Sequence, residues 1–258
     1  MTGERGAAVP AQQTWRSRGG GRVRGAVLWD VLREVLARVA GQGPCDVVDV
    51  GGGTGGFAVP LAELGHRVTV VDASPDALAA LERRAAEAGV SVRALQGDAG
   101  DLPEVLGESS ADLVLCHSVL EFVDDPAAVM HALTRVVRPG GAVSVLVAGQ
   151  IAAALHRAAA GRFDDARQVL SDPDGRWGEH DRMPRRFTRE SLAELAVGAG
   201  LTARETHGVR IFADLVPSAL LDDTGAAEGL VALERAASVH PVLRELATQL
   251  HLVAERPA

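Results

Sequence analysis

The sequence predicts an α/β fold, a doubly wound sheet of seven mostly parallel strands with helical insertions. Three observations support this prediction. Short apolar runs and amphipathic segments alternate for about 100 residues, a pattern typical of parallel strands joined by crossover helices. A cluster of glycines follows the first apolar run, where a strand would turn into a helix. Two further strand-like segments return near the carboxyl terminus, after a long stretch of different rhythm.

The alternating part of the chain extends from residue 46 to residue 147. Its expected strands are short apolar runs of the kind found in buried parallel sheets, at residues 46–50, 68–71, 90–95, 112–116 and 142–147. The expected helices between them are residues 55–64, 75–89 and 126–137. Ser74 before Pro75 indicates a helix start, because a capping hydroxyl precedes a proline in the first turn.

The alternation of strand-like and helix-like segments ends after residue 147. We expect a helix over residues 151–160, then a polar loop that contains Trp177 and Met183, then a helix over residues 188–199 with Thr188 as its cap. The last two strands are predicted at residues 202–206 and 249–255, with mostly helical chain over residues 217–247. Residues 1–22 are predicted to be a flexible tail, and residues 23–258 one domain with lid segments at about 150–187 and 208–247.

Composition narrows the class of protein. Hydrophobic residues make up 47% and charged residues 23% of the 258 residues, as in a globular protein. No apolar run could cross a bilayer and none resembles a signal peptide, so we expect a cytoplasmic protein without a membrane partner. Cys45 and Cys116 end or begin apolar runs, so we expect them to be buried, with no disulfide and no metal site. The net charge of −8 argues against nonspecific nucleic-acid binding, although a local arginine cluster could still contact RNA.

The glycine cluster after the first strand allows two interpretations. Gly51, Gly53 and Gly56 satisfy the G-x-G-x-x-G pattern of dinucleotide sites, which would indicate a nicotinamide or flavin cofactor. Asp49 favours another ligand, because a carboxylate at the strand end would repel a pyrophosphate. S-adenosylmethionine (SAM) instead carries a cationic ammonium and a cationic sulfonium, which a carboxylate attracts. Asp-x-Gly-x-Gly-x-Gly is the pattern of class I SAM-dependent methyltransferases, and the chain resembles them here, with Gly52 inside the motif.

Three later segments agree with a SAM site. Asp72 ends the second strand, where its two oxygens could accept hydrogen bonds from both ribose hydroxyls. Asp98 and Asp101 follow the third strand, and one of them is expected to face the adenine. His117 follows the fourth strand and is expected near the sulfonium.

The chain also resembles a narrower family, the bacterial methyltransferases that esterify 5-carboxymethoxyuridine at the tRNA wobble position. The resemblance covers roughly residues 22–255 and depends on the order and spacing of short matching pieces at residues 24–29, 51–53, 65–66, 117–123, 138–141, 160–164 and 208–212. It implies that the cofactor contacts are Arg24, Gly51, Gly52, Asp72, Ala99, Gly100 and His117. It also implies that Arg24 could pair with the α-carboxylate of SAM.

The chain departs from this family around the acceptor. Residues 148–149 and 171–175 replace an aromatic–asparagine pair and a basic lid, and Ala213 and Leu215 stand where the family has histidine and tyrosine. A flipped base is usually held by stacking, and the aromatic side chains that could do this are Phe163, Trp177, Phe187 and Phe212. The acceptor therefore stays open between tRNA and a small molecule, and a SAM-binding protein without activity is a third hypothesis.

The nature of the acceptor decides which catalytic residues are needed. A carboxylate acceptor is already ionised at neutral pH, so it requires an arginine to hold it rather than a base. Arg210 is the first candidate for that arginine, and Arg185 or Arg186 the second. A hydroxyl, phenol or amine acceptor would make a base useful, and the candidates are then His117, Glu121, His156 and His180. The sequence does not indicate the oligomeric state.

Overall fold

The computed structural model describes residues 19–41, 43–217, 219–220 and 223–258, without the side chains of residues 19–24 and 224. The described chain forms one seven-stranded sheet with helices on both faces, in the strand order β3-β2-β1-β4-β5-β7-β6. The doubly wound, mostly parallel fold predicted from the sequence is therefore confirmed, including the number of strands.

All strands except β7 are parallel. The strands are β1 (Asp46–Val50), β2 (Arg67–Asp72), β3 (Arg93–Gln96), β4 (Ala111–His117), β5 (Val137–Ala148), β6 (Thr202–Val209) and β7 (Gln249–Glu255). β7 lies antiparallel between β5 and β6. The strand order reverses between β1 and β4, and open α/β sheets bind ligands outside the carboxyl ends of their strands at such a switch point.

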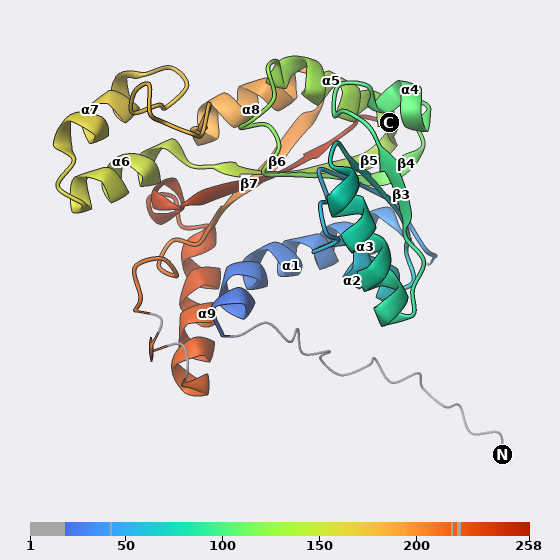
Figure 1. Ribbon diagram of the computed structural model, residues 1–258, viewed down its shortest axis with the longest axis horizontal. Helices are drawn as coiled ribbons and strands as arrows, with labels where there is room; N and C mark the ends of the chain where they lie inside the picture. Colours follow the sequence, from blue (N-terminus) through green and yellow to red (C-terminus); the bar gives the residue numbers. More distant parts are fainter. Residues whose placement is uncertain (1–18, 42, 218, 221–222) are drawn as a thin grey trace.

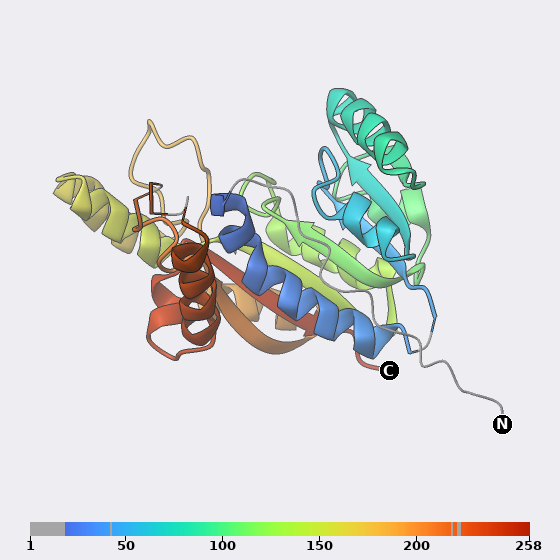
Figure 2. The same cartoon turned by 90° about the horizontal axis from the view of Figure 1, so that it is seen from below.

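Helices cover the two faces separately, as the views in Figures 1 and 2 show. Residues of α1 (Gly19–Val39), α2 (Ala58–Glu63) and α3 (Pro75–Ala88) pack into one apolar cluster with β1, β2 and β4. Residues of α4 (Leu102–Leu106), α5 (Pro126–Val136) and α8 (Arg189–Gly198) pack into the other. Beyond the carboxyl end of β5, α6 (Gln150–Ala159) and α7 (Phe163–Ser171) project from the sheet, and α9 (Thr224–Ser238) lies beside α1.

The amino-terminal edge of the sheet is held by ion pairs. Arg138 donates to Asp112 at 2.6 Å and to Asp46 at 3.0 Å, and Arg67 donates to Asp46 at 2.6 Å. These contacts join the first residues of neighbouring strands. The ion pairs account for the arginine of the Arg138-Pro-Gly-Gly segment. Close packing accounts for its last glycine, because a Cβ atom on Gly141 would be 2.8 Å from the carbonyl oxygen of Asp112. The segment therefore supports the edge opposite the carboxyl ends.

The structure differs from the predicted elements at several points, among them α4, which was not predicted, and β3, which begins at Arg93 rather than residue 90. β5 begins at Val137, because Gly140 adopts a φ of +78° that carries the strand through the expected turn. α2 begins at Ala58 rather than residue 55, since the glycines before it form the loop. α7 was not predicted, and α1 begins at Gly19, inside the expected tail. The rest of that tail, residues 1–18, lies outside the described residues.

Two further sequence expectations concern cysteines and membranes. Cys45 and Cys116 are both buried, as predicted, and both are free thiols. No helix in the described part of the chain has the length and apolar character needed to span a bilayer. Within the same residues, no group of three or more His, Cys, Asp or Glu side chains is arranged to hold a metal ion.

Candidate functional site: the carboxyl edge of the sheet

The glycine loop after β1 is a tight turn in which three glycines adopt positive φ angles, a conformation that costs glycine least. Gly51, Gly53 and Gly55 have φ angles of +66°, +54° and +81°. A Cβ atom on Gly51 would lie 2.4 Å from a methyl carbon of Val119, and one on Gly55 would lie 2.4 Å from a methyl carbon of Leu81. The loop therefore packs closely against Val119 and Leu81, while Gly51 and Gly56 remain exposed to solvent.

Asp49 lies underneath this loop. Its side chain is buried, and a Cβ atom on Gly52 would be 2.6 Å from its Oδ2 atom. That oxygen has no hydrogen-bond partner among the described residues. Burial, followed by the negative charge of Asp72, raises the pKa of Asp49 to about 7. A buried carboxylate with one unpartnered oxygen would be stabilised by a cation at the loop, as expected from the sequence.

Asp72 connects the end of β2 to the same loop. Its Oδ2 atom accepts a hydrogen bond from the Gly53 N–H at 2.9 Å, and its Oδ1 atom accepts one from the Ser74 N–H at 2.8 Å. Ser74, rather than Asp72, caps α3 through the Ala77 N–H. Each carboxylate oxygen of Asp72 keeps a further acceptor position, so two hydroxyl donors of a ribose could still bind there.

The segment after β3 lies next to Asp72. The Gly97 N–H donates to the carbonyl oxygen of Asp72 at 3.2 Å, and the Gly100 N–H donates to Oδ1 of Asp98 at 2.9 Å. Ala99 is nearly buried between the exposed residues Asp98 and Gly100. Asp101 is also exposed and begins α4 without a capping bond from its side chain. The segment thus presents backbone groups and two carboxylates beside the end of β2.

His117 ends β4 and is part of a buried hydrogen-bond chain. Its Nε2 atom lies 2.9 Å from Oγ of Ser144, which in turn lies 2.7 Å from Nε2 of His251. The His117 ring also meets Phe57 edge-on, with centroids 5.0 Å apart. Burial lowers the pKa of His117 to about 3, so the imidazole is neutral and a poor general base at neutral pH.

The side chain of Arg24 falls outside the described residues, although its backbone belongs to α1. Arg210 has a φ of +63° and donates to Oδ1 of Asp214 at 2.7 Å, and Asp214 also accepts from the Thr248 hydroxyl at 2.9 Å. Glu234 on α9 accepts hydrogen bonds from three successive backbone N–H groups that follow Arg210, those of residues 211–213. The fork of Arg210 is therefore held within the protein, beside β7.

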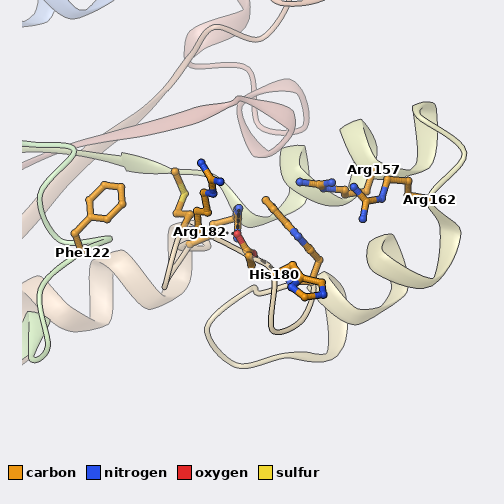
Figure 3. A pocket seen from close by; sticks show the side chains of 9 residues that line it. Phe122, Arg157, Arg162, His180 and Arg182 are labelled. Carbon is orange, nitrogen blue, oxygen red and sulfur yellow. Dashed lines mark hydrogen bonds and ion pairs between the residues drawn. The ribbon is translucent and has the colours of Figure 1, made fainter.

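Two neighbouring cavities, which share four lining residues, lie beyond the carboxyl end of β5, on the side of α6 and the lid loop, which we define as residues 172–188. The inner cavity, of about 240 Å³, is lined by Ala148, Gly149, Ala152, Ala153, His156, Arg157, Trp177, Met183, Arg186 and Thr248. The outer cavity, of about 450 Å³, opens to solvent and is lined by Phe122, Arg157, Arg162, Trp177, His180, Asp181, Arg182, Met183 and Arg186. Figure 3 shows Phe122 on one side of the outer cavity and Arg157 and Arg162 on the other.

Ion pairs fix the lid loop in place. Arg186 and Asp181 form a buried pair, with nitrogen–oxygen distances of 2.7 and 3.2 Å. Arg185 donates to Asp174 and to the carbonyl oxygens of Leu120 and Val123, which joins the lid loop to the segment after β4. Both arginines proposed from the sequence as second candidates for the acceptor therefore have structural partners.

Arg157 was not among the predicted site residues, and the structure places it against Trp177. The guanidinium carbon of Arg157 lies 3.4 Å from the centroid of the Trp177 ring, and that of Arg186 lies 4.2 Å from it. Trp177 was expected as a stacking surface, and the structure shows that arginines stack on it. Of the other proposed stacking residues, Phe163 is 72% exposed while Phe187 is 5% exposed. No sequence signal could have paired Arg157 with a residue 20 positions away in an irregular loop.

The chain is similar in sequence to known methyltransferases. The family model for a methyltransferase domain matches residues 48–145. A tRNA 5-carboxymethoxyuridine methyltransferase from Escherichia coli O157:H7 is 35% identical over 196 residues, which cover 75% of this chain and 73% of the relative. A ubiquinone biosynthesis O-methyltransferase from Pseudomonas syringae pv. tomato is 40% identical over 107 residues, which cover 42% of this chain and 44% of the relative.

Solved structures support the same fold at low sequence identity. A SAM-dependent methyltransferase from Methanosarcina mazei superimposes with a TM-score of 0.60 at 17% identity, covering 88% of this chain and 97% of the other. One from Mesorhizobium loti has a TM-score of 0.59 at 22% identity, covering 91% of this chain and 100% of the other. Identities this low establish similarity of fold only.

Proposed function

Because the chain belongs to the class I SAM-dependent methyltransferases, with S-adenosylmethionine as its cofactor, we propose that its acceptor is the carboxylate of 5-carboxymethoxyuridine at the tRNA wobble position. The enzyme class is established by the family and the fold. The acceptor and the residues that bind each substrate are our proposal.

We assign the cofactor to the carboxyl ends of β1 to β4. The Asp49 carboxylate would provide negative charge near the cationic part of SAM, and Asp72 would accept hydrogen bonds from the ribose hydroxyls. The remaining proposed contacts come from the glycine loop, the segment after β3, the end of β4 and the start of α1. They are Gly51, Gly52, Gly53, Asp98, Ala99, Gly100, His117 and Arg24. The buried unpartnered oxygen of Asp49 and the glycine cradle both fit this ligand.

The positively charged cavities beside β5 carry the proposal for the acceptor. Four arginines and one aspartate line the outer cavity, and two arginines without any acidic residue line the inner one. This occurs in a chain with a net charge of −8, so the positive charge is concentrated locally. Arginine together with exposed aromatic side chains suits an anionic nucleotide, because it binds carboxylate and phosphate groups and stacks on bases.

The chemistry of a carboxylate acceptor agrees with the groups present. SAM supplies a methyl group with a good leaving group, so the protein must position the acceptor and exclude water. The carboxylate forms the new oxygen–carbon bond without losing a proton, since it is already ionised at neutral pH. His117 has the low pKa of a buried neutral imidazole, which makes it unsuited to removing a proton. A carboxylate acceptor therefore needs no proton removed, either by His117 or by His156 and His180, which line the cavities.

A small-molecule acceptor is the second candidate, favoured by the acidic residues of α7. Asp165 lies 2.7 Å from Arg162 and 3.8 Å from Arg157, so it partly neutralises the arginine cluster. A smaller anionic metabolite would need fewer free arginines than a tRNA backbone would.

One experiment decides between the two acceptors. The purified protein is incubated with radiolabelled SAM and, in parallel, with tRNA that carries the unesterified wobble carboxylate and with a tRNA-free metabolite extract. We expect label to enter the tRNA, in a form released by mild alkali as an ester would be. Label only in the extract would support the small-molecule acceptor and reject the proposed function. Asp72→Ala, which should lose SAM binding, serves as the negative control.

A further inference from the structure

The arginines around the two cavities differ in how many of their donors are already used. Arg186 makes three hydrogen bonds within the lid loop, and Arg185 makes three to Asp174 and backbone carbonyls. Arg210 is bound by Asp214. Holding a substrate carboxylate with any of these would break interactions that fix the lid loop or the end of β6.

Arg157 on α6 is different. Its side chain makes no hydrogen bond to any residue that the structure describes, and its ion contact, to Asp165, is long at 3.8 Å. Asp165 is bound more closely by Nε of Arg162, at 2.7 Å. Arg157 is nevertheless three-quarters buried, with 22% of its side chain exposed, and it lines both cavities. A guanidinium that is largely removed from solvent and has unused donors has a strong preference for an incoming anion.

Trp177 holds this guanidinium in a defined orientation. The guanidinium carbon is 3.4 Å from the ring centroid, which is stacking distance. A guanidinium stacked by its flat face keeps the N–H groups along its edge available, in the geometry that binds a carboxylate through two parallel hydrogen bonds. The backbone of Trp177 is itself fixed, because its N–H donates to the buried carboxylate of Asp181.

The inner cavity leads from Arg157 to the end of β5. It is lined there by Ala148 and Gly149, and the Ala148 N–H donates to Glu121, in the segment that follows β4 and His117. The cavity therefore reaches the carboxyl end of β5, which pairs with β4, the nearest of the strands to whose ends we assign the methyl donor. An acceptor group bound at Arg157 would lie between the lid loop and these strand ends.

We propose that Arg157 is the specificity-determining residue that binds the carboxylate of the acceptor, with Trp177 orienting it. This rests on the proposed function, since it assumes a carboxylate acceptor. It assigns recognition of the carboxylate to α6 in place of Arg210, whose fork is bound by Asp214.

The test is a cycle that combines two changes, one in the enzyme and one in the substrate. Binding is measured, with S-adenosylhomocysteine present, for tRNA carrying 5-carboxymethoxyuridine and for the same tRNA carrying 5-hydroxyuridine, which lacks the carboxylate. The wild-type protein is expected to prefer the carboxylate tRNA by at least about tenfold. Arg157→Ala should reduce this preference to within twofold, and Arg157→Lys should restore only part of it, because lysine lacks the planar fork.

Two further variants control for general charge and folding. Arg182→Ala removes an exposed arginine of the outer cavity. It should lower the affinity for both tRNAs by the same factor. Arg167→Ala on α7, where the side chain is 82% exposed, should leave both affinities unchanged. All variants should bind S-adenosylhomocysteine within twofold of wild type, which shows that they are folded.

The outcomes separate the two proposals. The role of Arg157 is overturned if the Arg157→Ala variant still prefers the carboxylate tRNA, or if its affinity for both tRNAs falls by the same factor. The proposed function is then still supported if the wild type methylates tRNA. A wild type that transfers no methyl group to the carboxylate tRNA, while binding the cofactor, rejects the proposed function and this inference with it.

Discussion

The carboxylate of Asp72 accepts a hydrogen bond from the backbone N–H of Gly53 at 2.9 Å, so the end of β2 holds the glycine loop that follows β1. The same side chain accepts from Ser74 and lies within Coulombic range of Asp49. A single residue thus links the loop, the start of α3 and the buried acid below the loop. A ligand that binds the loop therefore contacts, or lies beside, the carboxylate of Asp72.

Replacing Asp72 should therefore remove cofactor binding. Asp72→Ala loses two acceptor oxygens for the ribose, and hydrogen bonds to a charged group contribute about 1.5–3 kcal/mol each. We expect SAM affinity to fall at least about 100-fold, measured by isothermal titration calorimetry. Asp76→Ala, a neighbouring acid in the first turn of α3, is the matched control and should change affinity by less than about threefold. Equal losses in both variants would show that the effect comes from α3 and not from the ribose.

SAM binding should also depend on the ionisation of Asp49. The pKa of this carboxyl is about 7 without ligand, and a cation beside it would favour the ionised form, so binding would release a proton. Affinity is then expected to rise by up to about tenfold per pH unit as the pH approaches 7, and to level off above it. Titrations from pH 5.5 to 8.5, in buffers of different ionisation enthalpy, measure both the affinity and the released proton.

Asp49→Asn should remove this pH dependence. Because the folded pKa is raised above the unfolded value, the protein without ligand loses stability as pH increases from about 4 to 7, and the variant does not. Asp49→Asn is thus expected to be more stable than wild type at pH 8 and to bind SAM more weakly. A wild-type affinity that is flat across the whole pH range would contradict a role for Asp49 in holding the cation.

The features that local sequence determines were predicted correctly. Ser74 and Thr188 cap their helices as expected, because a cap needs only residues within one turn. The glycine loop and the position of Asp72 also follow from short-range patterns, since parallel strands bring their carboxyl ends to one edge. The missed features depend on packing. α1 begins at glycines with low helix propensity, and it is stabilised by burying Leu32 and Leu36 against the sheet.

The acceptor side could be predicted least. Asp214 is four residues after Arg210, so their ion pair was within reach of sequence reasoning, whereas the Arg157–Trp177 contact joins a helix to an irregular loop. That the Oδ2 atom of Asp49 has no hydrogen-bond partner among the described residues is likewise a property of the folded interior. The sequence indicated that an arginine would bind the acceptor. Which arginine has donors left for it depends on the contacts that the other arginines make in the folded structure.

The glycine loop offers a matched pair of substitutions. Gly51→Ala places a Cβ atom 2.4 Å from Val119 at a φ of +66°, whereas Gly53→Ala meets its nearest neighbour at 3.9 Å with a φ of +54°. The second variant bears backbone strain of about 1 kcal/mol, and the first adds a steric clash of about 1–3 kcal/mol. We expect the melting temperature to fall distinctly more for Gly51→Ala. Equal falls would mean that Val119 moves aside at no cost.

Glu121 is expected to act as a support for the end of β5. Its Oε1 atom accepts from the Ala148 N–H at 2.8 Å, its Oε2 atom is buried without a described partner, and burial raises its pKa. Glu121→Ala leaves the Ala148 N–H unpaired and should cost about 1–3 kcal/mol in the free energy of unfolding, measured by urea denaturation. Glu121→Gln keeps an acceptor without a buried charge, so it should preserve stability and retain methyl transfer within about threefold. If Glu121→Gln instead folds normally, binds SAM and loses methyl transfer, the carboxylate takes part in the reaction as a base, and an acceptor that must lose a proton replaces the carboxylate acceptor.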